Sequence, residues 1–164
     1  ADSRGRALVY DLLPGWIRDL GVNTVGRLDY LTEGLLLLTN DGDFAQAVGH
    51  PSGGVAKKYV VETSSPIPYN LIDGWMDGVY IKGEWYRIAG YRRLSSCRVE
   101  LVLVEGKNRE IRKLFRYLSL QISKLARVAI GRLEIGDLPS GSWREITLHE
   151  RSALLSETPR GAGD

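Results

Sequence analysis

One carboxylate, Asp29, is placed where a side chain could do chemistry. It follows the apolar Val25 and precedes a Thr32-Glu33-Gly34 turn, four consecutive leucines at 35–38 and a strong turn signal at 40–43. This layout predicts an acid at the end of one element, held close to a buried strand, where it could act as a nucleophile or as a base. The alternative interpretation is an aspartate that caps a turn or accepts bonds from backbone amides, as most loop aspartates do.

A basic side chain that could reach such an acid occurs on a predicted helix at residues 108–120, with Asn108 as its expected N-cap. Ile111 and the apolar residues after it recur at helical spacing. At about 100° per residue, Arg112 is the basic residue closest to this buried stripe, so its guanidinium could meet a carboxylate in the interior. The alternative, which helix geometry alone favours, is a boundary arginine that extends to solvent. Tyr59, in a predicted strand, is by itself a strand-favouring aromatic.

The charge distribution indicates a polyanionic partner. The net charge is +2, but residues 82–132 hold thirteen Lys or Arg against four Glu, and the rest of the chain is acidic. Basic side chains near phosphates release counterions, so this region predicts an RNA-binding surface. A solvated basic face is the alternative.

Other kinds of site lack the residues they need. His50, His149 and Cys97 show no metal-ligand spacing, no serine lies in a nucleophile-elbow pattern, and Leu101 stands where a phosphate loop ending at Gly106-Lys107 would need glycine. We therefore expect neither metal nor cofactor. The single cysteine and the absence of a charged apolar leader or long apolar run favour a cytoplasmic protein without a membrane span.

The 164 residues suffice for one domain with a sizeable core. We expect the domain to span residues 1–156, followed by a disordered tail at 157–164, and to be monomeric. The pattern predicts helices at 6–13, 43–48, 68–76, 108–120 and 150–155. It predicts strands at 24–28, 35–39, 57–63, 79–81, 85–94, 97–104, 125–133 and 143–148. The predicted class is α+β, with a central mixed, largely antiparallel sheet flanked by helices.

Over residues 3–150 the chain resembles the pseudouridine synthases of the RsuA/RluB/RluE/RluF type, which modify uridines in ribosomal RNA. The matching motifs occur in family order: Ser3-Arg4-Gly5-Arg6, Gly26-Arg27-Leu28-Asp29 with Thr32 to Gly42, His50-Pro51-Ser52, Lys58-Tyr59, Gly106 to Arg112, and Gly141-Ser142-Trp143-Arg144. The family's Asn-Lys-Pro strand and S4 RNA-binding domain have no counterpart here, which indicates an N-terminally incomplete catalytic domain.

The resemblance implies an enzyme that isomerises a specific uridine without a cofactor or metal. Asp29 would be the catalytic aspartate, Tyr59 would stack on the target base and Arg112 would pair with Asp29. A neighbouring guanidinium keeps a buried carboxylate ionised. The RNA-binding residues would be Arg27, Lys58, Lys107, Arg109, Lys113 and Arg116.

Two other functions would fit parts of this sequence. The first is a non-catalytic RNA-binding domain of the same fold, which would not need a buried acid beside the RNA. The second is a glycosidase using Asp29 and Glu33, which a strongly basic surface suits poorly.

Overall fold

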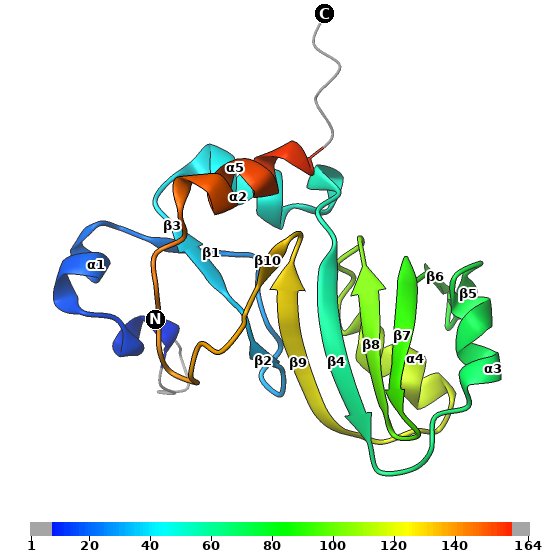
Figure 1. The fold of residues 1–164 in the computed structure, drawn as a ribbon. Coiled ribbons are helices and arrows are strands. Elements are labelled where there is room, and N and C mark those ends of the chain that lie inside the picture. Colours follow the sequence, from blue (N-terminus) through cyan, green and yellow to red (C-terminus); the bar gives the residue numbers. More distant parts are fainter. Residues whose placement is uncertain (1–7, 159–164) are drawn as a thin grey trace, which may run out of the picture.

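The largest sheet of this computed structural model, which describes residues 8–158, has six strands in the order β10-β9-β4-β8-β7, with β2 added beside β9. These strands are β2 (Glu33–Gly34), β4 (Lys57–Thr63), β7 (Gly90–Ser95), β8 (Arg98–Leu103), β9 (Ile122–Ile130) and β10 (Leu133–Glu134). Every pairing is antiparallel except that of β2 with β9. The α+β prediction with a mixed, largely antiparallel sheet is confirmed (Figure 1).

The remaining strands form two small ribbons. The first joins β1 (Asn23–Val25) to β3 (Leu37–Thr39), and the second joins β5 (Val79–Ile81) to β6 (Glu84–Tyr86). The α-helices are α1 (Gly15–Asp19), α2 (Gly42–Gly49), α3 (Tyr69–Ile72), α4 (Glu110–Tyr117) and α5 (Leu148–Ser156). Short 3-10 helices occupy Val9–Leu12, Pro51–Gly53 and Asp73–Trp75.

Two hydrophobic clusters build the interior. The larger one packs α4, through residues such as Leu114 and Phe115, against β4, β8 and β9, and it includes Trp75. The smaller one joins α2 and α5 to the β1–β3 ribbon and contains Val48 and Leu154, both without exposed surface. Figure 1 shows α4 behind the sheet, and α2 with α5 above its upper end. The apolar stripe predicted for the helix after Gly106 thus faces the core.

Near the N-terminus the predicted helix at 6–13 is wrong in extent. The described part forms a 3-10 helix at Val9–Leu12, and α1 then begins at Gly15, after Pro14 as its N-cap. Proline is tolerated at the start of a helix because the first N–H groups have no helical partner. The Pro14-Gly15 pair therefore opens a helix, where the sequence suggested the end of one. Residues 1–7, with the Ser3-Arg4-Gly5-Arg6 motif, lie outside the described residues.

The strand predicted at 143–148 is wrong. Residues 143–147 form no strand, and α5 already begins at Leu148. The hydroxyl of Thr147 accepts a hydrogen bond from Glu150 N at 3.1 Å, and the Glu150 carboxylate accepts one from Thr147 N at 2.8 Å. This capping box starts the helix two residues earlier than predicted. Trp143 packs edge-to-face on Trp16, with ring centroids 5.7 Å apart.

Other predicted boundaries shift at local breaks. The strand expected at 85–94 is divided between β6 and β7, which belong to different sheets. The predicted helix at 68–76 is α3 followed by a 3-10 turn, and the strand at 125–133 is the hairpin of β9 and β10. Of the predicted tail, Glu157 and Thr158 are described, and Glu157 accepts a hydrogen bond from Arg132 N at 2.9 Å. Residues 159–164 lie outside the described residues.

Candidate active site

A cleft of about 820 Å³ opens between the two hydrophobic clusters. Val25 and Val48 of the smaller cluster and Leu103 and Ile111 of the larger one contribute to its wall. The cleft therefore lies at the seam where two packed units meet, a common location for ligand sites. Its polar lining comes from the loop after β1, from β4 and β9, and from the segment that leads into α4.

The loop that carries Asp29 is fixed at both ends. Gly26 adopts φ 73°, which ends β1 after Val25 and makes the predicted strand at 24–28 shorter than expected. Beyond the loop, Gly34 lies against Arg127, and a Cβ on Gly34 would be 2.2 Å from the Arg127 carbonyl oxygen. Only glycine allows β2 to approach β9 this closely.

Asp29 itself closes a turn with its main chain, because Thr32 N donates to Asp29 O at 2.8 Å. Its carboxylate, about one third exposed, faces Arg112: Oδ2 lies 3.8 Å from Nε of the arginine. The side chain is thus available in the cleft, and the main-chain bond, not the carboxylate, closes the turn between Asp29 and Thr32.

Arg112 lies on α4, and only 12% of its side chain is exposed. Its Nη2 donates to Leu31 O at 2.6 Å and to the Thr32 hydroxyl at 3.4 Å, so the guanidinium also holds the Asp29 loop. Burial lowers the pKa of Arg112, while the charge of Asp29 acts in the opposite direction. Helix geometry alone favoured a solvent orientation for Arg112, and the structure has the interior one.

Tyr59 lies in the middle of the cleft lining, on β4, and packs half-buried against the larger cluster. The strand that carries it is paired on both sides, with β8 and with β9. Its ring is therefore held by a rigid element, as a stacking platform needs to be. Asp29, Tyr59 and Arg112, the three predicted catalytic residues, all line one cleft.

The predicted RNA-binding residues divide into two groups. Arg27, Lys107 and Arg109 line the cleft, whereas Lys58, Lys113 and Arg116 are not part of its lining. Lys58 alternates with Tyr59 along β4 and so faces the opposite side of the sheet. Arg109, expected inside the helix, is instead its N-cap at φ 51°, which corrects the prediction of Asn108 in that position.

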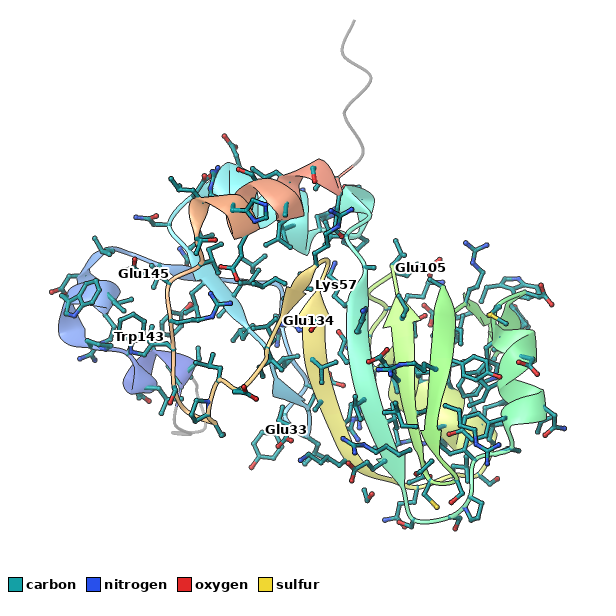
Figure 2. All side chains as sticks on the ribbon, in the orientation of Figure 1. Glu33, Lys57, Glu105, Glu134, Trp143 and Glu145 are labelled. Atoms are coloured by element: carbon teal, nitrogen blue, oxygen red, sulfur yellow. The ribbon has the colours of Figure 1, made fainter. Side chains whose placement is uncertain are left out.

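Two of these basic residues, Lys107 and Lys113, already form hydrogen bonds and ion pairs within the chain. Lys113 Nζ donates to the Tyr86 hydroxyl at 2.7 Å and to Glu84 at 3.2 Å, which ties α4 to β6. Lys107 Nζ donates to Trp85 O and pairs with Glu105 at 2.7 Å. Figure 2 shows Glu105 at the same end of the sheet as Lys57.

The basic region at 82–132 is less uniform than its sequence suggests. Six of its basic residues besides Arg112 form ion pairs, several with acids from elsewhere in the chain: Arg92, Arg98, Lys107, Lys113, Lys124 and Arg132. The part of this charge that faces the cleft is therefore smaller than the formal count.

Among the cleft residues that the sequence analysis did not single out are Lys57, Glu110 and Arg127. Glu110 is 4% exposed, and burial raises its pKa from 4.5 to about 7. Burial, followed by the charge of Arg127, lowers the pKa of Lys57. A charged residue on an otherwise apolar face is the sequence signal that could have indicated them. Lys57 and Arg127 each lie on a strand face that also carries core residues, and Glu110 directly precedes the core residue Ile111.

The three catalytic candidates also lie within one family match. A model described as RNA pseudouridylate synthase matches residues 18–117, more than half of the chain. The chain belongs to this family. Asp29, Tyr59 and Arg112 all lie inside the part that matches the RNA pseudouridylate synthase model.

Curated relatives agree with the family assignment. The chain is 35% identical to an "Uncharacterized RNA pseudouridine synthase" of Borreliella burgdorferi, over 94% of this chain and 62% of the relative. It is 32% identical to "Ribosomal large subunit pseudouridine synthase B" of Bacillus subtilis, over 98% of this chain and 67% of that protein. The chain thus spans less than two thirds of several relatives. It covers 62% of the length of the Borreliella protein, and 62% and 60% of the lengths of relatives from Rickettsia prowazekii and Rickettsia typhi.

Two solved structures share the fold. The chain resembles the "Crystal structure of pseudouridylate synthase" with a TM-score of 0.83 and 26% identity, over 89% of this chain and 64% of that one. The archaeal box H/ACA sRNP Nop10–Cbf5 complex matches with a TM-score of 0.52 and 19% identity, which shows likeness of fold alone. No helix within residues 8–158 has the length and apolarity to cross a membrane. No group of three potential metal ligands occurs in the same residues.

Proposed function

We propose that this chain converts a specific uridine of ribosomal RNA to pseudouridine, with Asp29 as the catalytic carboxylate. The observation that carries the proposal is the Asp29–Arg112 pair, 3.8 Å apart in the cleft that Tyr59 also lines. An acid beside a buried guanidinium on the same wall as an aromatic ring suits a reaction on a flipped-out base.

The isomerisation breaks the N1–C1′ glycosidic bond, turns the uracil and forms a C5–C1′ bond. C5 then loses its hydrogen as a proton, and N1, which no longer bonds to the sugar, gains a proton. The carboxylate of Asp29 serves this sequence as a nucleophile or as a base, and both roles need its ionised form. Arg112 supplies the positive charge beside it and anchors the loop through Leu31 O at 2.6 Å. Its role therefore combines positioning with electrostatics.

A stacked uridine cannot reach the acid, so the nucleotide must leave its helix or loop and enter the cleft. Tyr59 then offers its ring to the uracil. Arg27, exposed two residues before Asp29 on the cleft lining, is suited to hold a phosphate of the displaced nucleotide. Lys58, Lys113 and Arg116, which lie outside the lining, would contact more distant parts of the RNA.

The test is a map of pseudouridines in ribosomal RNA from cells with and without the gene. We expect one position to lose its modification in the deletion strain and to regain it when the wild-type gene is restored. An unchanged map would favour the alternative, a non-catalytic RNA-binding domain of the same fold. Restoration with Asp29→Asn separates the two functions further, because a binding domain would not need the carboxylate.

A further inference from the structure

Two cations lie in the cleft wall beside Tyr59. Arg127 is directly across from Tyr59 in the pairing of β4 with β9, and it is 3% exposed. Lys57 is two residues before Tyr59 on the same face of β4 and is labelled at the start of that strand in Figure 2. Both line the cleft that contains Asp29.

A β-bulge brings these side chains to one face. The pairing of β4 with β9 shifts between Lys58 and Tyr59, so that Lys58 faces Ala129 while Tyr59 faces Arg127. The unmatched residue lies on β9, because β4 pairs regularly with β8 over the same stretch. Bulges of this kind re-aim side chains next to functional sites.

Neither cation is neutralised by the protein. Nε of Arg127 donates to Leu35 O at 2.7 Å, but its Nη2 is buried and has no hydrogen-bond partner. Nζ of Lys57 makes one long bond, 3.4 Å, to Val48 O. Within residues 8–158, no carboxylate forms an ion pair with either side chain; the nearby Asp29 pairs with Arg112.

Such an arrangement is costly without a ligand. A buried donor without an acceptor loses its hydrogen bonds to water and gains none in the protein. Two like charges in a buried, low-dielectric environment also repel each other. Burial and the charge of Arg127 both lower the pKa of Lys57, which agrees with this repulsion. An anion bound between the two would satisfy Nη2 and offset both charges.

We propose that Lys57 and Arg127 form a phosphate-binding site for the RNA nucleotide whose base stacks on Tyr59. The proposal rests on the proposed function, since it assumes that RNA enters this cleft. Tyr59 and Arg127 are cross-strand neighbours, which usually lie about 5 Å apart at their Cβ atoms, so a nucleotide stacked on the ring would place its phosphates beside the Arg127 side chain. A guanidinium and an ammonium together suit a phosphodiester better than a neutral carbonyl group.

The test compares binding of uridine 3′,5′-bisphosphate and of uridine to the wild-type chain by calorimetry. We expect the bisphosphate to bind at least about tenfold more tightly, as a charge-assisted hydrogen bond allows. Lys57→Met should remove most of this difference. Lys58→Met changes the same charge one residue away, on the other face of the sheet, and should keep the difference within about twofold because a mononucleotide does not span the sheet.

Inorganic phosphate separates the possible sources of the signal. If the site recognises phosphate itself, orthophosphate should compete with the bisphosphate on the wild type and not on Lys57→Met. Arg127→Lys, checked for folding by its thermal transition, should bind the bisphosphate less tightly than the wild type because it loses the planar fork. Equal affinities for uridine and its bisphosphate, or equal losses in Lys57→Met and Lys58→Met, would overturn the proposal.

These measurements need no turnover, so they stand apart from the proposed isomerisation. A chain that leaves ribosomal RNA unmodified but binds the bisphosphate through Lys57 would refute the function and keep the phosphate site. An active chain that binds uridine and its bisphosphate alike would do the reverse.

Discussion

Nε of Arg112 lies 3.8 Å from Oδ2 of Asp29, and Nη2 of the same guanidinium donates to Leu31 O at 2.6 Å. One side chain of α4 thus places a positive charge beside the acid and also fixes the loop that carries the acid. Leaving the carboxylate without this partner costs electrostatic stabilisation and geometry together.

Arg112→Met should therefore lower kcat for pseudouridine formation by at least about a hundredfold. Arg112→Lys keeps the charge but loses the planar fork, so its kcat should fall between those of the wild type and the methionine variant. Lys113→Met is the control, because it removes the same charge from the same helix. The side chain of Lys113 contacts Glu84 and Tyr86 and does not line the cleft. Equal losses of kcat in the two methionine variants would reduce Arg112 to an ordinary surface charge.

Substitutions of Tyr59 test whether its ring carries the base. Tyr59→Phe keeps the stacking surface and should retain most of the affinity for a short uridine-containing RNA. Tyr59→Leu fills a similar space without a π-face and should weaken binding by about 1–3 kcal/mol. Fluorescence anisotropy at fixed salt measures both variants. A leucine variant that binds as tightly as the phenylalanine variant would remove Tyr59 from the stacking role.

RNA binding should be salt-dependent in a way that reports on the cleft. Arg109 lines the cleft at the start of α4 and is exposed, so Arg109→Met should reduce the slope of log affinity against log salt by about 0.7–0.9. Arg92 pairs with Glu100 at 3.2 Å on β7 and β8, outside the cleft lining, and Arg92→Met should change the slope much less. Identical slopes for the two variants would mean that the whole basic region contributes evenly.

Stability should depend on pH through Glu110, whose pKa burial raises from 4.5 to about 7. A raised pKa favours the neutral form in the folded state, so the stabilisation is complete below pH 4.5 and is lost as the pH rises to 7. The shift corresponds to about 3 kcal/mol in the free energy of unfolding.

Denaturant unfolding between pH 5 and 8 checks this dependence. Glu110→Gln should flatten the curve and be the more stable protein at pH 8. Glu145→Gln changes an exposed acid that does not act on the pKa of Glu110, and it should leave the slope as in the wild type. A wild-type curve that rises over this pH range, or a Glu110→Gln curve that keeps the wild-type slope, would contradict the assignment.

Much of the framework could be predicted from local pattern. The Val- and Tyr-rich stretch at 57–63 and the apolar stripe after Gly106 are each local to one element, and both form as expected. The contact between Asp29 and Arg112 could not be predicted from local pattern. Helix periodicity alone favoured a solvent-facing arginine, and the choice of Asp29 as its partner came from the family motif.

The rest depends on a local helix cap that the hydrophobic pattern does not reveal and on contacts between distant segments. The strand predicted at 143–148 fails because a Thr147–Glu150 capping box outweighs the β-favouring composition before it. Lys57 and Arg127 share a wall only because of a bulge in the pairing of β4 with β9, and single-sequence periodicity carries no information on such a shift. Glu110 sits at the start of a helix, where an acid is normally solvated, and only the tertiary packing buries it.

The most direct test of the central claim measures tritium release from ribosomal RNA transcribed with [5-³H]uridine, because forming the C5–C1′ bond expels the hydrogen on C5. The wild-type chain should release tritium from one uridine per RNA molecule. Asp29→Asn, which keeps the shape of the side chain and loses its charge, should bind the RNA and release tritium at less than about a thousandth of the wild-type rate, the scale seen when a catalytic group is removed. Two results would contradict the claim that this chain is a synthase acting through Asp29. One is no tritium release by the wild type, and the other is release by Asp29→Asn at more than about a thousandth of the wild-type rate.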